Sequence, residues 1–225
     1  KLYTKTISVY EKIVTIKPDT ITFHSRLAKL YSKVSRNEDS LNHYLQAAKI
    51  CQERNRTEDA IHLLKLALQE NPFDFQAAHF LASLYEQTDR SNKAFPLYLS
   101  MGEHHEKNQE LTEAFDCYQK AFAINRDHIE LCRKLARIAS DHSPAAAPGF
   151  LERWYEMLSS RKDLTGIDEF MELYLDHCGV QPDIWENVII LLIENNFLEK
   201  CKRYMEELLS LFERNADHER IIRTG

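Results

Sequence analysis

The stretch Leu27-Ala28-Lys29-Leu30-Tyr31 returns as Leu81-Ala82-Ser83-Leu84-Tyr85, and then as Leu135-Ala136-Arg137-Ile138-Ala139. Successive copies are separated by 54 residues. Other positions repeat at the same offset: Tyr44 and Tyr98, Ala48 and Gly102, Ala60 and Ala114, Leu64 and Tyr118. Agreement at so many positions predicts a chain built from an internal structural repeat.

Within each copy, apolar residues recur at intervals of three and four, as on amphipathic helices that bury one stripe. Polar or Pro-containing breaks then predict helices near residues 3–17, 20–35, 38–54, 57–71, 74–88, 91–107, 110–124, 127–140, 150–161, 164–178, 182–195 and 197–214. One 54-residue copy therefore holds three helices. Short connectors force neighbouring helices to run antiparallel, so the prediction is an all-α solenoid of about twelve helices.

The repeat divides the chain into four predicted parts. Residues 1–140 form the repeats, and 141–149 form a joint that holds two of the six Pro residues. Residues 150–214 continue as further helical hairpins, although the 54-residue register is lost there. The polar tail, 215–225, is expected to fray.

The composition excludes several classes of protein. The 225 residues include 5 Gly and 6 Pro, too few for a β-sandwich or for Gly-rich phosphate loops. The net charge is −6, which disfavours non-specific binding to nucleic acid. Five dispersed cysteines without a CxxC pair indicate a reducing, cytoplasmic setting and no zinc site.

The sequence also bears on membrane insertion and on the N-terminal end of the solenoid. The longest aliphatic run, 188–193, is far too short to span a bilayer, so no membrane insertion is expected. The chain begins with Lys1 and not Met, which indicates a piece of a larger protein. If the first helix has no preceding partner, Leu2, Ile7 and Val14 are exposed, and this open end of the solenoid permits self-association.

The repeated positions resemble the tetratricopeptide-repeat (TPR) family of helix-turn-helix units. The first-helix pattern is matched by Leu27, Ala28 and Tyr31 and by Leu81, Ala82 and Tyr85, and the second-helix pattern by Ala60, Leu64, Ala67 and Pro72. The usual 34-residue spacing is replaced here by 54, so helices such as 38–54 must serve two units. The resemblance implies a right-handed superhelix whose first helices line a concave groove.

The C-terminal third fits that family only loosely. Its segment 179–183, followed by Trp185, looks like one unit of the pentatricopeptide family, which binds single-stranded RNA. One unit is weak evidence, because that family reads one base per repeat.

The candidate catalytic and metal-binding patterns fail. His104, His105 and Glu106 diverge on a helix and lack the second His of an HExxH motif, so they are interpreted as solvent-facing polar residues. Cys117 and Cys132 lie in apolar stripes, typical of inert structural thiols. Trp154 is expected in the core. No cofactor and no metal are expected, and the chain is predicted not to be an enzyme.

Polar positions on the first helix of each copy are the candidate contacts with a partner. The predicted partner-binding residues are Lys29, Lys33, His79, Ser83, Glu86, Arg133 and Arg137. Arg133 and Arg137 share one helical face and resemble the basic residues with which some TPR proteins clamp a terminal carboxylate. The alternative without a ligand, in which both Arg residues pair with Glu130 or neighbouring acids, stays open.

The predicted function is a non-catalytic scaffold that binds a peptide or helix of a partner protein in the groove, within a larger protein or complex. Two alternatives remain at this point. One is an RNA-binding helical repeat, and the other is the regulatory arm of an enzyme whose catalytic domain lies outside this sequence.

Overall fold

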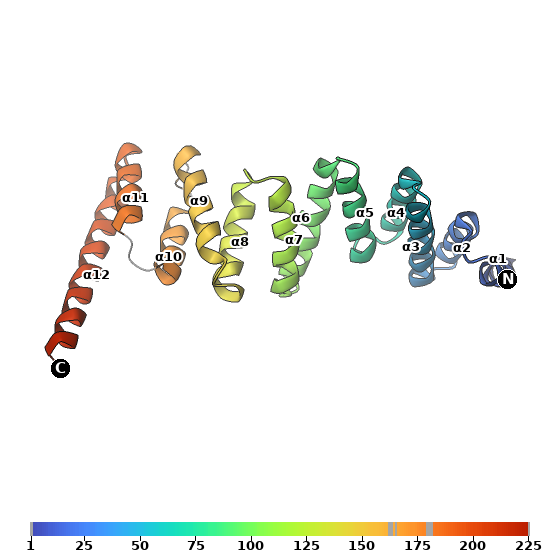
Figure 1. The fold of residues 1–225 in the computed structure, drawn as a ribbon, viewed down its shortest axis with the longest axis horizontal. Coiled ribbons are helices and arrows are strands. Elements are labelled where there is room, and N and C mark those ends of the chain that lie inside the picture. Colours follow the sequence, from blue (N-terminus) through green and yellow to red (C-terminus); the bar gives the residue numbers. More distant parts are fainter. Residues whose placement is uncertain (1, 162–163, 165, 179–181, 225) are drawn as a thin grey trace. The chain divides into compact units, whose positions relative to one another are not determined.

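The structure is a computed structural model that describes residues 2–161, 164, 166–178 and 182–224, with the backbone alone at 2, 182, 211–212 and 214–224. Its described part contains α-helices and no strands (Figure 1). The helices are α1 (Leu2–Ile16), α2 (Ile21–Lys33), α3 (Asn37–Glu53), α4 (Thr57–Glu70), α5 (Phe75–Gln87), α6 (Ser91–Lys107), α7 (Leu111–Ile124), α8 (Ile129–His142), α9 (Ala147–Arg161), α10 (Ile167–Cys178), α11 (Pro182–Glu194) and α12 (Leu198–Thr224). The all-α prediction is confirmed.

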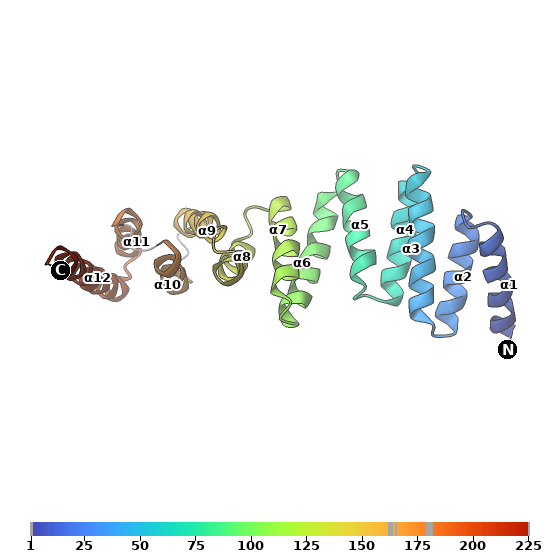
Figure 2. The ribbon, with the colours of Figure 1, turned by 60° about the horizontal axis from the view of Figure 1, so that its bottom comes forward.

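The helices form two compact units, Lys1–Asn125 (unit 1) and Arg126–Gly225 (unit 2). In unit 1, successive helices run antiparallel from α1 to α7 (Figure 2). Packing is closest between α2 and α3, α3 and α4, α5 and α6, and α6 and α7. Helices α3 and α6 thus each pack against two neighbours within their repeat, which is the double role expected from a three-helix period.

Small residues at the repeated positions allow this close packing. Ala28, Ala48 and Ala82 are fully buried. At Gly102 a Cβ atom would lie 2.5 Å from the ring of Tyr118, so glycine is required by the approach of α7 to α6. One copy earlier, the corresponding positions hold Ala48 and Leu64. Ala48 is larger than Gly102, and Leu64 is smaller than Tyr118.

The turns between helices follow the same 54-residue repeat. Ser35 and Asp89 adopt φ of 58° and 55°, and Asn55 and Gln109 adopt 57° and 64°. After each of these residues the next backbone N–H bonds to a carbonyl five residues earlier, for example Arg36 to Tyr31 at 3.0 Å and Arg90 to Tyr85 at 2.8 Å. These are left-handed helix caps made without glycine. The scarcity of glycine therefore does not mean a scarcity of tight turns.

Unit 2 packs around large aromatic side chains. Helix α9 contacts both α8 and α10, and α11 pairs with α12. Trp154 is 1% exposed and meets the ring of Phe170 edge-on at 5.7 Å, so the predicted core position of Trp154 is confirmed. Trp185 is buried as well and lies edge-on to Tyr204 at 6.1 Å.

The predicted joint and tail differ from the structure. Helix α8 continues to His142 and α9 begins at Ala147, so the break covers only 143–146, and the units divide after Asn125 instead. Pro148 lies in the first turn of α9, where the missing N–H costs nothing. Helix α12 runs on to Thr224, because neither Gly nor Pro occurs between 198 and 224 to end it.

The expected open N-terminal end is also partly wrong. Ile7 is buried against Leu27 and Tyr31, and Val14 packs at the edge of this cluster, because α1 lies against α2. The side chain of Leu2 lies outside the described residues. None of the described helices is both long enough and apolar enough to cross a bilayer.

Candidate functional site

A hollow of about 720 Å³ lies between α3 and α5 in unit 1. We call it the α3–α5 groove. Its lining combines an apolar floor with a polar rim: Leu45, Lys49, Gln52, Phe75, Gln76, His79, Phe80 and Ser83. Leu45 is buried, whereas Lys49, Gln76 and His79 are exposed. The groove can therefore offer apolar contacts and hydrogen bonds to the same ligand.

Local contacts fix the wall of this groove. The carboxylate of Asp74 accepts a hydrogen bond from the Ala77 N–H at 2.8 Å and so caps the N-terminus of α5. The next residue, Phe75, packs against the rings of His104 and His105 at 4.8 and 4.6 Å. These two histidines belong to α6, so the groove wall is anchored to the helix behind it.

The polar rim of the groove is cationic. Nζ of Lys120, on α7, donates to Nε2 of His79 at 2.6 Å and lies 5.6 Å from the centre of the Tyr98 ring. Partial desolvation of the imidazole ring and the charge of Lys120 lower the pKa of His79, which favours the neutral imidazole that accepts this bond. Lys49 has no ion-pair partner among the described residues. An acidic group on a ligand would complement Lys49.

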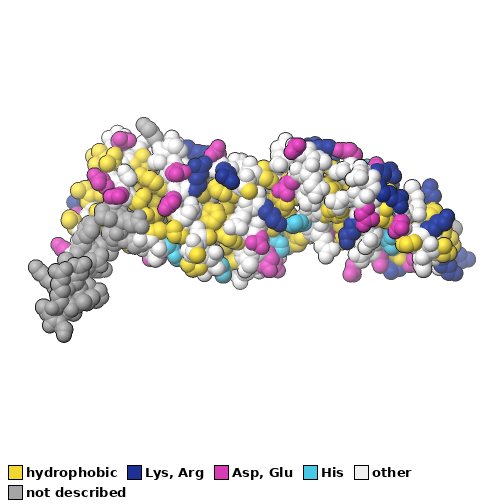
Figure 3. Space-filling view, viewed as in Figure 1, with side chains coloured by type: hydrophobic (Ala, Val, Ile, Leu, Met, Phe, Trp, Pro, Cys, Tyr) yellow, Lys and Arg dark blue, Asp and Glu magenta, His cyan; other side chains and the backbone are white. Residues whose placement is uncertain are grey.

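A smaller hollow, of about 280 Å³, lies between α2 and α4. Its lining shares no residue with the α3–α5 groove: Ile21, Thr22, Ser25, Arg26, Lys29, Arg56, Asp59, His62 and Leu63. Figure 3 shows Lys and Arg side chains over this N-terminal part of the chain. The predicted contacts Lys29 and Ser83 therefore line different hollows.

The odd number of helices in each repeat explains this separation. Antiparallel helices alternate between two layers, so helices two apart share a layer. Side chains confirm the pattern: Gln52 of α3 contacts Gln87 of α5, and His79 of α5 contacts Lys120 of α7. Moving on by three helices changes the layer, so the first helices of successive copies, α2 and α5, do not line one common groove.

The remaining predicted contacts are engaged within the protein. Lys33 is exposed and its Nζ lies 5.6 Å from the Tyr3 ring centre. Glu86 accepts a hydrogen bond from the Tyr98 hydroxyl at 3.4 Å. Arg133 pairs with Glu130 and, at 3.0 Å, with Glu169, as expected if this side chain pairs with neighbouring acids and not with a ligand. Arg137 is exposed and also takes part in an interaction, and it belongs to unit 2 together with Arg133.

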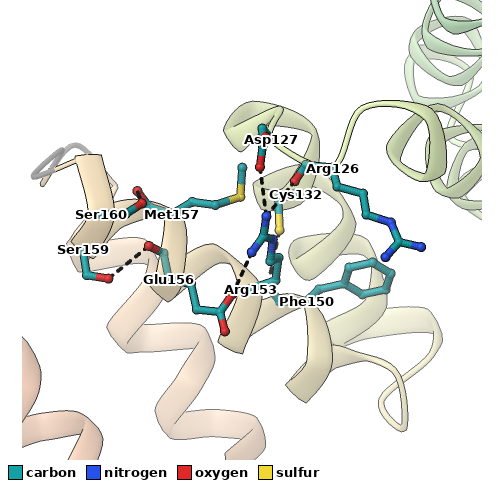
Figure 4. Close-up of polar contacts among 9 residues, drawn as sticks. All are labelled: Arg126, Asp127, Cys132, Phe150, Arg153, Glu156, Met157, Ser159 and Ser160. Atoms are coloured by element: carbon teal, nitrogen blue, oxygen red, sulfur yellow. Dashed lines mark hydrogen bonds and ion pairs between the residues drawn. The ribbon is translucent and has the colours of Figure 1, made fainter.

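Cys132 is a structural thiol. It lies in the interface of α8 and α9, where its Sγ donates to the Phe150 carbonyl at 3.4 Å (Figure 4). Burial raises the pKa of this thiol to about 12, so almost no thiolate is present at neutral pH. Beside it, the guanidinium of Arg153 joins Asp127 at 2.9 Å to Glu156 at 2.8 Å. This cluster holds α9 on α8.

The interpretation of residues 104–106 as solvent-facing needs correction. His104 and His105 pack on Phe75, and His105 also pairs with Glu110 at 2.6 Å. Glu106 accepts a hydrogen bond from the Tyr118 hydroxyl at 2.7 Å. All three are half-buried because α5 and α7 flank them. Among the described residues no cluster of three potential metal ligands occurs.

The positions that carry the TPR resemblance form the core of unit 1. Leu27, Leu81, Ala60 and Ala114 are all buried, as is Tyr118. The chain is a TPR-like helical repeat.

No protein-family model and no curated protein matches the chain. Similar solved structures include a MamA protein, with 16% identity over 96% of this chain and 97% of that one and a TM-score of 0.30. Another is the C-terminal part of a TPR repeat-containing protein from Cytophaga hutchinsonii, with 14% identity, coverage of 93% and 90%, and a TM-score of 0.31. A third is the Rap conjugation gene regulator of plasmid pLS20 in complex with the Phr* peptide, with 16% identity, coverage of 95% and 64%, and a TM-score of 0.38.

Proposed function

We propose that the protein is a non-catalytic scaffold that binds a peptide or helix of a partner protein in the α3–α5 groove, as part of a larger protein or complex. The observation that carries this proposal is the groove itself, with Leu45, Phe75 and Phe80 on its floor and Lys49 at its rim. Apolar anchors in a concave site supply affinity, and a few polar groups fix the orientation of the ligand.

The lining also specifies the chemistry of the partner. A segment that presents one or two large apolar side chains can cover the floor, and a carboxylate one turn away can pair with Lys49. Neutral His79, held in place by Lys120, adds a polar side chain to the rim that the ligand covers. We therefore expect an extended or helical segment with mixed apolar and acidic residues.

A selection from a random 12-residue peptide library tests the proposal. We expect enrichment of peptides that contain aromatic or aliphatic residues next to Asp or Glu. Ser83→Arg places a long side chain in the groove and should weaken a selected peptide at least tenfold, measured by calorimetry. Gln76→Glu, at the exposed rim, repels the acidic residues of the ligand and provides a second variant that does not disturb the interior.

Ser25→Arg is the matched control, because Ser25 is equally half-buried but lines the hollow between α2 and α4. It should change the peptide affinity by less than twofold. If no peptide is enriched, or if Ser83→Arg and Gln76→Glu bind a selected peptide as well as the natural sequence does, the groove is not the binding site. Tight, salt-sensitive binding of a single-stranded RNA pool would favour the RNA alternative instead.

A further inference from the structure

A pocket of about 340 Å³ lies in unit 2, lined by residues of α10, α11 and α12. We call it the α10–α12 pocket. Apolar side chains form its base, and carboxylates surround them: Asp168, Met171, Glu172, Leu175, Asp176, Trp185, Arg203, Tyr204 and Glu207. It is separate from the α3–α5 groove, which belongs to unit 1.

Within the part of the chain that the structure describes, Asp168 is the one carboxylate of this pocket that pairs with cations. Asp168 accepts hydrogen bonds from Lys200 at 2.7 Å and from Arg203 and the Tyr204 hydroxyl, all on α12. These donors hold the pKa of Asp168 near 2 although burial opposes the charge. Because Arg203 pairs with Asp168, its charge does not neutralise the other carboxylates of the pocket.

The other three carboxylates have no cationic partner. Glu172 and Asp176 follow Asp168 at intervals of four on α10, so they share its helical face, and Glu207 adds a third charge from α12. None of the three forms an ion pair with a described residue. Like charges four residues apart repel each other, and a bound cation relieves this repulsion.

A second observation at the pocket is independent of the charges. Trp185 lines it and is 1% exposed, yet its indole Nε1–H has no acceptor among the described residues. Buried N–H groups are nearly always hydrogen-bonded, because an unpaired donor loses its interaction with water. The pocket thus combines an excess of negative charge with one unsatisfied donor beside an aromatic base.

From these observations we infer that the α10–α12 pocket binds an arginine or lysine side chain of a basic peptide. The aliphatic stem of such a side chain fits over Met171 and Leu175, and its cation reaches Glu172, Asp176 and Glu207 at the rim. The Trp185 indole, whose N–H has no acceptor among the described residues, borders the same pocket and reports on its occupation. Residues 126–225 contain 13 Lys and Arg against 19 Asp and Glu, which attracts a basic partner to this unit.

A titration followed by the indole Nε1–H resonances of the full ¹⁵N-labelled chain tests this inference. The probe is the peptide acetyl-Ala-Arg-Ala-Arg-Ala-amide, and the same peptide with Gln in place of Arg is the control. We expect a saturable shift of the Trp185 resonance, assigned with Trp185→Phe, from the Arg peptide alone. The resonance of Trp154, which is buried between α9 and α10, should not move.

Removal of the two α10 charges in Glu172→Gln combined with Asp176→Asn should weaken the Arg peptide at least tenfold. Asp183→Asn removes an exposed charge from α11 outside the pocket and should weaken it less than twofold. An absent or non-saturating Trp185 shift overturns the inference, as does equal binding of the Gln peptide or an unchanged affinity in the double variant. Because these variants lie in unit 2, their failure leaves the test of the α3–α5 groove intact.

Discussion

The two units of the chain reach a buried core in different ways. In unit 1, Ala and Gly at positions 54 residues apart let helix backbones approach closely, as at Ala48 and Gly102. Unit 1 also buries rings, but Tyr44 and Tyr98 recur at the same offset, whereas unit 2 holds the cluster of Trp154, Phe170 and Tyr174, which has no such repeat. The first kind of packing repeats in the sequence and can be recognised there, whereas the second depends on single large residues without a counterpart elsewhere in the chain.

The close packing of unit 1 predicts the largest effect of a single methyl group. Gly102→Ala places a Cβ atom 2.5 Å from the Tyr118 ring and should lower the free energy of unfolding by about 2 kcal/mol. Urea unfolding followed by circular dichroism measures this loss. The double variant Gly102→Ala with Tyr118→Leu recreates the Ala48 and Leu64 pair of the preceding copy and should recover most of it.

Gly149 in unit 2 is the matched control for this variant. It lies in α9, and nothing lies within 4 Å of an added Cβ atom. Gly149→Ala should therefore stabilise the protein by about 0.5 kcal/mol, since alanine favours a helix. If both alanine variants change stability in the same direction, the contrast between the two units is wrong.

A polar contact specific to unit 2 predicts a smaller loss. Asp168→Asn removes the charge that holds Lys200 and Arg203 of α12 on α10, and it should cost about 1 kcal/mol, because half of this side chain remains exposed to water. The folded-state pKa of Asp168 is lowered to about 2, so its contribution is present above pH 4 and is lost as the pH falls towards 2.

Thermal unfolding of the natural sequence and of Asp168→Asn between pH 2 and pH 6 measures this contribution. The two curves of melting temperature against pH should converge at the acid end. Glu199→Gln, which removes an exposed charge on the first turn of α12, is the control. Its curve of melting temperature against pH should run parallel to that of the natural sequence. A constant difference between natural sequence and Asp168→Asn at every pH contradicts the role given to the Asp168 charge.

A histidine pair in unit 1 predicts the smallest effect. Nε2–H of His24 donates to the Pro18 carbonyl at 2.8 Å, so its Nδ1 must accept from Nδ1–H of His43 at 3.0 Å. Burial and the proximity of His24 lower the pKa of His43, while Asp39 and Glu11 act in the opposite direction. The unfolded chain therefore binds more protons below about pH 6.5, and unit 1 loses stability on acidification.

The loss from the histidine pair should appear as a fall in the free energy of unfolding as the pH is lowered from 7.5 to 5.5. His43→Gln should make the stability of the protein depend less steeply on pH over this range, whereas His62→Gln, an exposed position on α4, should leave the slope unchanged. The lowered pKa of His79 contributes a second part of the slope, which should persist in His43→Gln. An unchanged slope in His43→Gln contradicts this assignment.

The sequence predicted the twelve helices of the described residues, because spacings of three and four and polar breaks are local signals. It assigned the groove wrongly in one respect, since a period of three antiparallel helices places Lys29 and His79 in different layers. The left-handed turns at Ser35 and Gln109 could not be predicted, because no glycine marks them in the sequence. The contacts of Asp168 join residues that are 32 to 36 positions apart and do not follow the 54-residue repeat. No sequence pattern therefore predicts them.

Binding of a partner protein in the α3–α5 groove can be detected by crosslinking in living cells. A photoreactive phenylalanine analogue is placed at Gln76, on the exposed rim of the groove, or at Gln69, an exposed position on α4 that lines neither the α3–α5 groove nor the hollow between α2 and α4. If the groove is the binding site, one partner protein is crosslinked from position 76 and not from position 69, and Ser83→Arg abolishes this product. Equal crosslinking from both positions, or a product from position 69 alone, would contradict it.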